Sequence, residues 1–317
     1  MRALVTGASG FVGRELVSRL LAAGWKVTAL SRRHDPGLPA AAQIVTGDLT
    51  ADAGLPSAVC DGVDVIFHCA GELKDASMMR RVHVEGTRLL LAHVPRGAAM
   101  PRWVQLSSVG AYGPPRIPSE TRIVDETTAE NAAGEYETTK TESDHLVRRF
   151  ADEHGMSYAI LRPSNVIGAG MSNASLRGVI SAIDRGRFFY IGRAGAMANY
   201  VHVDDVAEAL MACGTRRESC GETFNLSSDC SWIELVEHVA RVRGVRPPRL
   251  RLPERAVRLG AAAAGTVWPG RLPLTSSRIS ALVGRTRYPT RKIEAVLGFR
   301  LTRPMPAAVD DVVAIGT

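Results

Sequence analysis

The chain has 317 residues, of which 45% are hydrophobic and 22% are charged, and its formal net charge is +7 at pH 7. This balance excludes collagen-like, disordered and disulfide-framework proteins, and the length suffices for a large core with a smaller lobe beside it. The Ala-rich run from Gly260 to Val267 is among the longest apolar stretches, yet it falls short of the roughly 20 residues that a membrane span needs. We therefore expect no integral membrane span.

The cysteines and arginines further restrict the kinds of protein and partner that fit this sequence. The five cysteines form no CxxC pair and no zinc-ligand spacing, and the N-terminus lacks the pattern of a signal peptide. We expect reduced thiols, no structural metal and a cytoplasmic location. Arginine is densest between Arg241 and Arg258, which could attract an anionic substrate or an acidic membrane surface, although a solvated face is the plainer interpretation. Without interleaved aromatic residues, this stretch does not predict a nucleic-acid partner.

Short β-branched runs alternate with helical patterns through the first half of the chain, which predicts βαβ units and a parallel sheet. The expected strands are Ala3–Thr6, Lys26–Leu30, Gln43–Thr46, Val63–His68, Trp103–Ser107 and Ser157–Leu161. A first helix is expected over Phe11–Ala23, with Gly24 as its C-terminal stop, and longer helices over Met78–Val94 and Thr138–Glu153. The fold class is therefore α/β, with a doubly wound parallel sheet.

A glycine-rich loop lies between the first strand and the first helix. Gly7, Gly10 and Gly13 form a G-x-x-G-x-x-G pattern there. Gly7 permits the tight turn, Gly10 lets the backbone approach a pyrophosphate, and Gly13 allows close packing of the helix, whose N-terminus favours phosphate. In this context the pattern predicts a dinucleotide site on a Rossmann-type fold. The expected contacts are Gly7, Ser9, Gly10, Phe11, Val12 and Gly13.

The ends of the second and third strands bear on the choice of cofactor. An NAD site usually carries a carboxylate after the second strand, whereas this chain has Ser31, Arg32 and Arg33. A guanidinium can pair with a 2′-phosphate through two hydrogen bonds, so NADP(H) is favoured and NAD(H) is the alternative. Asp48 and Leu49 follow the third strand, where a carboxylate could accept from the adenine amino group; a simple turn carboxylate fits nearly as well.

After Pro163 the sequence becomes rich in glycine and in shorter elements, without a linker or a repeat. We predict an NAD(P)-binding Rossmann core over residues 1–165 and mainly a substrate-binding lobe over 166–317, with 199–230 returning to the core. Within it, a strand over Asn199–Val203 is expected to precede a helix that Asp204 or Asp205 caps.

Tyr136 and Lys140 stand four residues apart in a helical segment, so both project from one face. An ammonium close to a phenol lowers the phenol's pKa from about 10, which makes tyrosine usable as an acid or base near neutral pH. Ser107 and Ser108 follow a strand at the carboxyl end of the sheet, where open α/β folds bind ligands. A hydroxyl there can donate to a substrate oxygen on which charge develops.

Together, these motifs resemble the short-chain dehydrogenase/reductase superfamily, specifically its extended, epimerase/dehydratase-like branch, over most of the chain. In that family the Ser four residues before the Tyr of a Y-G pair is catalytic, which selects Ser108 before Tyr112 and Gly113. The resemblance implies that Tyr136 relays the proton and that Lys140 is its partner. It further implies hydride transfer between a nicotinamide and a carbonyl or secondary alcohol carbon.

Three further segments carry the resemblance. Residues 162–168, RPSNVIG, look like the family's R-P-x-x-V-x-G strand end, whose backbone lies against the nicotinamide amide. Residues 199–206, NYVHVDDV, look like a marker of the branch, and the loop after the fourth strand is implied to lie near the ribose and phosphates. The implied cofactor contacts in these segments and after the fifth strand are Cys69, Ala70, Gly71, Ser107, Pro163, Asn165 and Val166.

One position departs from the family's pattern. Where relatives often read N-V-x-G-T on the long helix, residues 83–87 read HVEGT. We expect His83 to be a structural histidine with satisfied hydrogen bonds, and altered proton delivery is the alternative.

The C-terminal third resembles 3β-hydroxysteroid dehydrogenase and dihydroflavonol reductase-like members, which act on a hydroxyl or carbonyl of a bulky apolar molecule. The residues that carry this resemblance are Leu252, Pro253, Leu274, Thr275, Tyr288, Lys292, Leu297, Gly298 and Phe299. It implies a reductase or dehydrogenase for a small-molecule substrate. The apolar Ala256–Trp268 segment would suit a pocket wall or a membrane-surface contact, and a packed helix fits equally well.

Two alternatives stay open. A nucleotide-sugar 4-epimerase or 4-reductase would work through a transient keto intermediate, with Arg177, Arg187 or Arg193 near the pyrophosphate. A non-catalytic dinucleotide sensor is disfavoured, because such proteins tend to lose the tyrosine or the lysine. A homodimer through the two long helices is a family-level expectation.

Overall fold

Seven parallel strands form the central sheet, in the order β11-β7-β5-β4-β1-β2-β3. The strands are β1 (Arg2–Thr6), β2 (Lys26–Ser31), β3 (Gln43–Thr46), β4 (Val65–His68), β5 (Arg102–Leu106), β7 (Tyr158–Pro163) and β11 (Glu222–Leu226). This computed structural model describes residues 1–33, 37–51, 54–117, 120–171, 174–267 and 274–314. Because the strand order reverses between β1 and β4, the predicted doubly wound α/β fold is confirmed.

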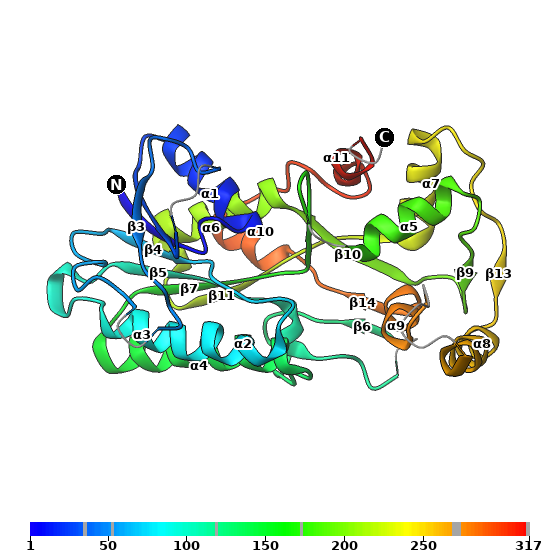
Figure 1. Cartoon of the computed structure of the whole chain (residues 1–317), viewed down its shortest axis with the longest axis horizontal. Helices are drawn as coiled ribbons and strands as arrows, with labels where there is room; N and C mark the ends of the chain where they lie inside the picture. The colour runs from blue at the N-terminus through cyan, green and yellow to red at the C-terminus, as the bar shows by residue number, and fades with distance from the viewer. Residues whose placement is uncertain (34–36, 52–53, 118–119, 172–173, 268–273, 315–317) are drawn as a thin grey trace.

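Helices cover both faces of this sheet (Figure 1). On one face lie α1 (Phe11–Ala22), α6 (Val203–Thr215) and α10 (Arg291–Leu297). On the other lie α2 (Ala76–Arg80), α3 (Gly86–Ala92) and α4 (Glu135–His154). Successive residues of a strand point to opposite faces, so β1 sends Val5 into the core under α1 and α6, and Leu4 into the core that contains Trp103 and Val147.

The helix expected over Met78–Val94 is not a plain α-helix. It begins at Ala76, where the Asp75 side chain accepts the N–H of Ser77, and it contains a π-helical turn, η1 (Arg81–Glu85), before α3. This wider turn holds His83, whose side chain is buried together with that of Thr87 in α3. Single π-helical turns are often found at functional sites.

A second group of elements lies beyond the carboxyl ends of the central strands (Figure 1). Its strands are β6 (Thr121–Ile123), β8 (Asn165–Ile167), β9 (Tyr190–Ile191), β10 (Met197–His202), β12 (Ser228–Ser231), β13 (Arg251–Leu252) and β14 (Arg285–Arg287). They pair as β12-β10-β8, β13-β9 and β14-β6. The helices of this part are α5 (Ala174–Asp184), α7 (Trp232–Val242), α8 (Glu254–Val267), α9 (Ser276–Val283) and α11 (Asp310–Ala314). Short 3-10 helices are η2 (Gly97–Ala99), η3 (Val109–Tyr112), η4 (Arg217–Ser219) and η5 (Ala307–Val309).

The strand expected at Asn199–Val203 is β10, and it joins the three-stranded sheet rather than the central one. The chain then reaches the central sheet through α6, which packs on β7 and β5, and through the edge strand β11. The division into a core and a lobe at residue 165 stays a prediction. The predicted cap of α6 is wrong, because the ring of His202 accepts the N–H of Asp204, while Asp205 accepts from the backbone of Thr302 and Arg303.

Within the described ranges, no helix combines the length and apolar character that a membrane crossing requires. Among the same residues, no group of three or more His, Cys, Asp or Glu side chains could hold a metal ion. The cysteines are free thiols, and Cys60, Cys213 and Cys230 are buried.

The glycine loop fits so tightly that side chains are excluded. Gly7 has a φ of +63°, and a Cβ atom there would lie 2.7 Å from the carbonyl of Cys69 after β4. A Cβ atom at Gly13 would lie 2.1 Å from the carbonyl oxygen of Gly7. Helix α1 can therefore approach the loop only because position 13 carries no side chain.

We predict that Gly13→Ala lowers the free energy of unfolding by at least about 2 kcal/mol, because the methyl group forces the loop and α1 apart. The matched control is Gly178→Ala in α5, where a Cβ atom would meet nothing within 4 Å. That change should raise the free energy of unfolding by about 0.5–1 kcal/mol through helix propensity. Urea unfolding of both variants checks this pair, and equal effects would contradict it.

Candidate active site

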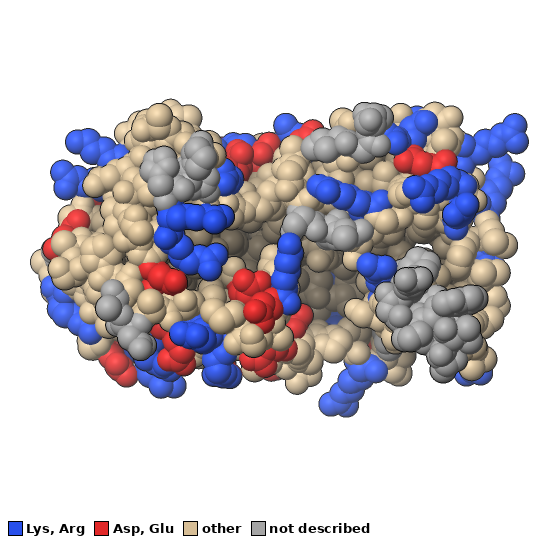
Figure 2. All heavy atoms as spheres, in the orientation of Figure 1, with Lys and Arg blue, Asp and Glu red and all other residues tan. Residues whose placement is uncertain are grey.

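A cavity of about 790 Å³ opens at the carboxyl ends of the central strands. Figure 2 shows the surface hollowed in the middle of the molecule, between the central sheet and the second group of elements. The predicted site residues that line the cavity are Gly7, Gly10, Phe11, Val12, Gly13, Cys69, Ala70, Gly71, Ser107, Ser108, Tyr136, Lys140, Pro163, Asn165 and Val166. They come from five separate segments of the chain. The fold therefore joins the glycine loop and the candidate catalytic residues in one space.

Six predicted cofactor residues lie outside this cavity, namely Ser9, Ser31, Arg32, Arg33, Asp48 and Leu49. The hydroxyl of Ser31 donates to the backbone carbonyl of Arg33, while Arg32 and Arg33 are exposed at the end of β2. Asp48 follows β3 and accepts from the backbone and the hydroxyl of Thr50, and these bonds, with a smaller contribution from Arg32, lower its pKa. Because β2 adjoins β1 and β3 adjoins β2 in the sheet, the residues that follow β2 and β3 continue the line of strand ends that begins at the cavity.

The N-terminus of α1 fits the phosphates of a dinucleotide. Within the described residues, no side chain caps this helix at Gly10, and its first turn contains no acidic residue. The N–H groups of the first turn are left without helical partners, and together with the helix dipole they favour an anion. The loop itself is closed by a hydrogen bond from the N–H of Gly10 to the carbonyl of Gly7.

A chain of buried hydrogen bonds connects the strand before this loop to the helices on the other face. The hydroxyl of Thr6 accepts the N–H of Ala70 at 3.2 Å and contacts His68 Nδ1 at 2.7 Å. His68 Nε2 lies 2.9 Å from the hydroxyl of Thr87, and that hydroxyl lies 2.8 Å from Ser143 on α4. All these side chains are buried.

The direction of each bond in this chain can be assigned. The hydroxyl of Thr87 donates to the carbonyl of His83, so it must accept from both His68 Nε2 and Ser143. Nδ1 is then the acceptor, and Thr6 donates to it. Burial and, less strongly, the charge of Lys140 lower the pKa of His68 to about 3, so the ring is neutral and carries the one N–H that the assignment requires.

Helix α4 brings Tyr136 and Lys140 to the cavity one turn apart, as the spacing predicts. Ser108 stands at the end of β5 and caps η3, where its Oγ accepts the N–H of Gly110 at 3.0 Å. With one lone pair engaged in this way, the hydroxyl hydrogen of Ser108 stays available to a ligand in the cavity.

The predicted lowering of the Tyr136 pKa by Lys140 is wrong for this arrangement. Burial, together with the negative charges of Glu137 and Asp144, raises the pKa of Tyr136 to about 12. Burial also lowers the pKa of Lys140, and the nearby Asp144 only partly opposes this effect. The phenol is therefore protonated at neutral pH and is an acid rather than a base in this state.

Asp144 lies one turn beyond Lys140 and is fully buried. Its Oδ2 accepts from the hydroxyl of Ser107 at 2.7 Å and from the guanidinium of Arg162 at 2.9 Å. Its Oδ1 is the single buried side-chain oxygen or nitrogen without a hydrogen-bond partner among the described residues. The guanidinium of Arg162 also binds Glu130. Burial raises the pKa of Glu130, but the interactions with Arg162, His145 and Arg148 together lower it to about 2.

His83 has the structural role expected of it. Its Nε2 accepts the N–H of Glu72 at 2.9 Å, and its Nδ1 contacts the hydroxyl of Thr139 at 2.8 Å. Burial, with the charge of Lys140, lowers the pKa of His83 to about 3, so both ring nitrogens are satisfied in the neutral form. The ring also meets Tyr136 edge-on, with 5.5 Å between the ring centroids. His83 therefore packs against one side of the Tyr136 ring.

Eleven of the described lining residues escaped prediction as site residues, among them Leu73, Glu137, Met171 and Tyr288. The sequence could have predicted Glu137 as a lining residue, because it follows Tyr136 directly. An α-helix turns only about 100° per residue, so two neighbouring side chains can both reach a broad cavity. Tyr288 comes from a distant segment that the pairing of β14 with β6 brings to the cavity. Nothing in the sequence marks that short parallel pair.

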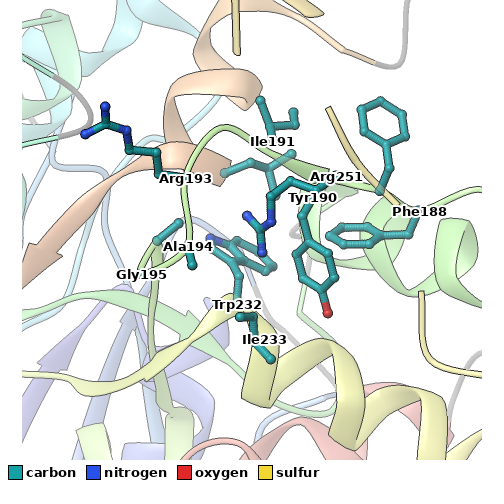
Figure 3. A pocket seen from close by; sticks show the side chains of 12 residues that line it. Phe188, Tyr190, Ile191, Arg193, Ala194, Gly195, Trp232, Ile233 and Arg251 are labelled. Atoms are coloured by element: carbon teal, nitrogen blue, oxygen red, sulfur yellow. The ribbon is translucent and has the colours of Figure 1, made fainter. Parts of the chain in front are cut away.

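The arginines proposed for a nucleotide sugar lie apart from this cavity. Arg177 is exposed and donates to the carbonyl of Met171. Arg193 borders a smaller hollow, where Figure 3 shows its guanidinium pointing away from Trp232. In the same hollow the guanidinium of Arg251 lies over the ring of Tyr190, 4.9 Å from its centroid. Arg187 borders a third cavity of about 510 Å³, whose walls are mainly apolar.

Known proteins resemble this chain over most of its length. It is 29% identical over 271 residues to a ceramide reductase of Caulobacter vibrioides, and the aligned region covers 83% of this chain and 77% of that protein. It is 30% identical over 280 residues to a UDP-glucose 4-epimerase of Mycolicibacterium smegmatis, and the aligned region covers 79% of this chain and 87% of that protein. The crystal structure of a UDP-glucuronic acid 4-epimerase from Bacillus cereus in complex with NAD is 18% identical and shares the fold, with a TM-score of 0.73 over 99% of this chain and 97% of that one.

The family model for the NAD dependent epimerase/dehydratase family matches residues 3–227, which include nearly all of the central sheet and every described lining residue of the cavity except Tyr288. The chain therefore belongs to the NAD dependent epimerase/dehydratase family, the extended branch of the short-chain dehydrogenases/reductases.

Proposed function

We propose that this protein is an NADP(H)-dependent reductase or dehydrogenase that interconverts a ketone and a secondary alcohol on a small molecule. The observation that carries the proposal is the meeting of Ser108, Tyr136 and Lys140 with the glycine loop around one cavity. The protonated state of Tyr136 favours the reductive direction, because a reduced carbonyl oxygen needs a proton. The ceramide reductase relative supports the choice, since its name describes reduction of a lipid.

In the reductive direction, Ser108 and Tyr136 act on the same substrate atom. The hydroxyl of Ser108 donates a hydrogen bond to the carbonyl oxygen and stabilises the charge that develops there. Reduced nicotinamide, when bound, supplies the hydride that forms the new C–H bond. As the C=O π bond breaks, the phenolic proton of Tyr136 moves to the oxygen, and the product is a secondary alcohol.

Lys140 and Asp144 support this chemistry from beneath the cavity. The ammonium of Lys140 is 5% exposed and would donate to the ribose of the cofactor. Asp144 provides the compensating negative charge one turn away, and Arg162 and Ser107 hold Asp144 in place. The lysine thus lies in a low-dielectric site and forms no ion pair with any residue that the structure describes.

The preference for NADP(H) over NAD(H) belongs to this proposal. Arg32 and Arg33 are exposed at the end of β2, and Arg14 on α1 donates from Nε to the carbonyl of Ser9. Within the described residues, no carboxylate stands at the end of β2 to accept from ribose hydroxyls. These guanidinium groups favour the additional 2′-phosphate.

The location and assembly of the enzyme are also proposals. A cytoplasmic location suits five free thiols. A homodimer would form through the outer faces of α3 and α4, and light scattering of the purified protein measures its mass.

Replacing Tyr136 by Phe should reduce kcat for ketone reduction about 10²–10⁴-fold, because the proton donor is lost. The affinity for NADPH should change little. The measurement is NADPH oxidation with a panel of aryl and long-chain alkyl ketones, and Tyr190→Phe, outside the cavity, is the control. If the wild type oxidises no NADPH with any of them and instead retains tightly bound NAD, the nucleotide-sugar 4-epimerase is the better assignment.

The pH dependence follows from the raised pKa of Tyr136. Because the donor stays protonated up to about pH 12, kcat for reduction should be flat from about pH 6 to about pH 9. Alcohol oxidation needs the phenolate, whose fraction rises about tenfold per pH unit below the pKa. Glu137→Gln should move the oxidative rise to lower pH, since one of the negative charges that raise the pKa is removed. Identical pH profiles for the two proteins would contradict this assignment.

Arg32→Ser should weaken NADPH binding about 10- to 100-fold, the usual loss for a hydrogen bond to a charged group, and should change NADH binding less than about threefold. Fluorescence titration with both dinucleotides measures the two dissociation constants. The exposed Arg217→Ser in η4 is the control. Equal losses for both dinucleotides would show that Arg32 does not contact the 2′-phosphate.

A further inference from the structure

The substrate cavity has an unusual charge for a chain with a net charge of +7. Among its described lining residues, Glu137 and Lys140 are the only charged side chains, and arginine is absent. Asp144, behind Lys140, opposes the effect of burial on the pKa of Lys140 and is itself paired with Arg162. Glu137 is the one acidic side chain among the described lining residues.

Two glycines fix the place of Glu137. A Cβ atom at Gly110 would lie 2.6 Å from Glu137 Cγ, and a Cβ atom at Gly134 would lie 2.5 Å from Glu137 Oε2. Gly110 belongs to the serine loop, and the same Cβ atom would lie 3.3 Å from the Oγ of Ser108. The side chain of Glu137 therefore packs across both glycines, beside the hydroxyl that binds the reacting oxygen.

The carboxylate of Glu137 has no basic partner in the described part of the chain. All the ion pairs of α4 are made by other residues, such as Glu130 with His145 and Arg80 with Glu142. Glu137 stands in the first turn of α4, where the helix dipole stabilises a negative charge without supplying a partner. The carboxylate of Glu137 is half-buried and can only accept hydrogen bonds. A donor from solvent or from a ligand is therefore needed to satisfy it.

We infer that Glu137 determines substrate specificity by accepting a hydrogen bond from a hydroxyl or amino group close to the reacting carbonyl. The substrate class is then an uncharged or cationic ketone with such a donor on an otherwise apolar body. Anions such as nucleoside diphosphate sugars are repelled by the same carboxylate and find no arginine in the described lining of the cavity. This inference rests on the proposed reductase activity and names its substrate class.

The test uses two ketones of matched size, 3-(hydroxymethyl)acetophenone and 3-acetylbenzoate. At the same position of the ring, the first carries a hydroxymethyl group and the second a carboxylate. Their dissociation constants are measured by titration calorimetry on the wild-type protein loaded with NADP⁺, so the result does not depend on turnover. The wild type should bind the hydroxymethyl ketone at least about tenfold more tightly. Glu137→Gln keeps the shape of the side chain and should reduce this preference to less than about threefold.

Glu135→Gln is the matched control, because Glu135 is an exposed carboxylate of the same helical turn that does not line the cavity. It should keep the preference of the wild type. The inference is overturned if the wild type shows no preference or does not bind the hydroxymethyl ketone, if Glu137→Gln keeps the full preference, or if Glu135→Gln loses it equally. If the hydroxymethyl ketone binds as expected but is not reduced by NADPH, the proposed activity fails while the assignment of Glu137 stands.

Discussion

The hydrogen bonds around His68 and Thr87 are the constraint on which the site depends. The hydroxyl of Thr87 has three partners, and each of them comes from a different element of the fold. His68 is the last residue of β4, so the same bonds fix the loop that meets Gly7 at a distance where no side chain fits. Because every polar group in this buried chain has a partner, a shift of either helix or of the glycine loop would leave a donor unsatisfied at a cost of about 1–3 kcal/mol.

The same packing explains why Tyr136 and Lys140 have shifted pKa values. Removing Tyr136 and Lys140 from water disfavours the charged form of each, so burial raises the pKa of the phenol and lowers that of the lysine, and Asp144 opposes the second shift. The spacing of a tyrosine and a lysine alone suggests mutual stabilisation of phenolate and ammonium. In the folded chain, burial and two nearby carboxylates dominate over that attraction.

Local sequence patterns predicted most of the strands and helices around the glycine loop. Features that depend on contacts between distant segments could not be predicted from such patterns. The strands around β1 and the helix after Gly10 follow from periodicity and glycine spacing, which act within about a dozen residues. The cap of α6 by His202 could not be predicted in this way, because Asp205 is taken by the segment around Thr302, almost a hundred residues away. Tyr288 reaches the cavity for the same kind of reason, through a pairing of short strands without a sequence signal.

The charge of the whole chain is a poor guide to the charge of its site. Exposed arginines account for the basic surface, and each of them is solvated and screened over about 8–10 Å at physiological ionic strength. A ligand inside the cavity responds instead to the few groups with which it shares a low dielectric. There the balance is set by which residues α4 turns inward, and the first turn of that helix presents Glu137 beside Tyr136. A basic protein can therefore have a cavity whose described lining contains no arginine.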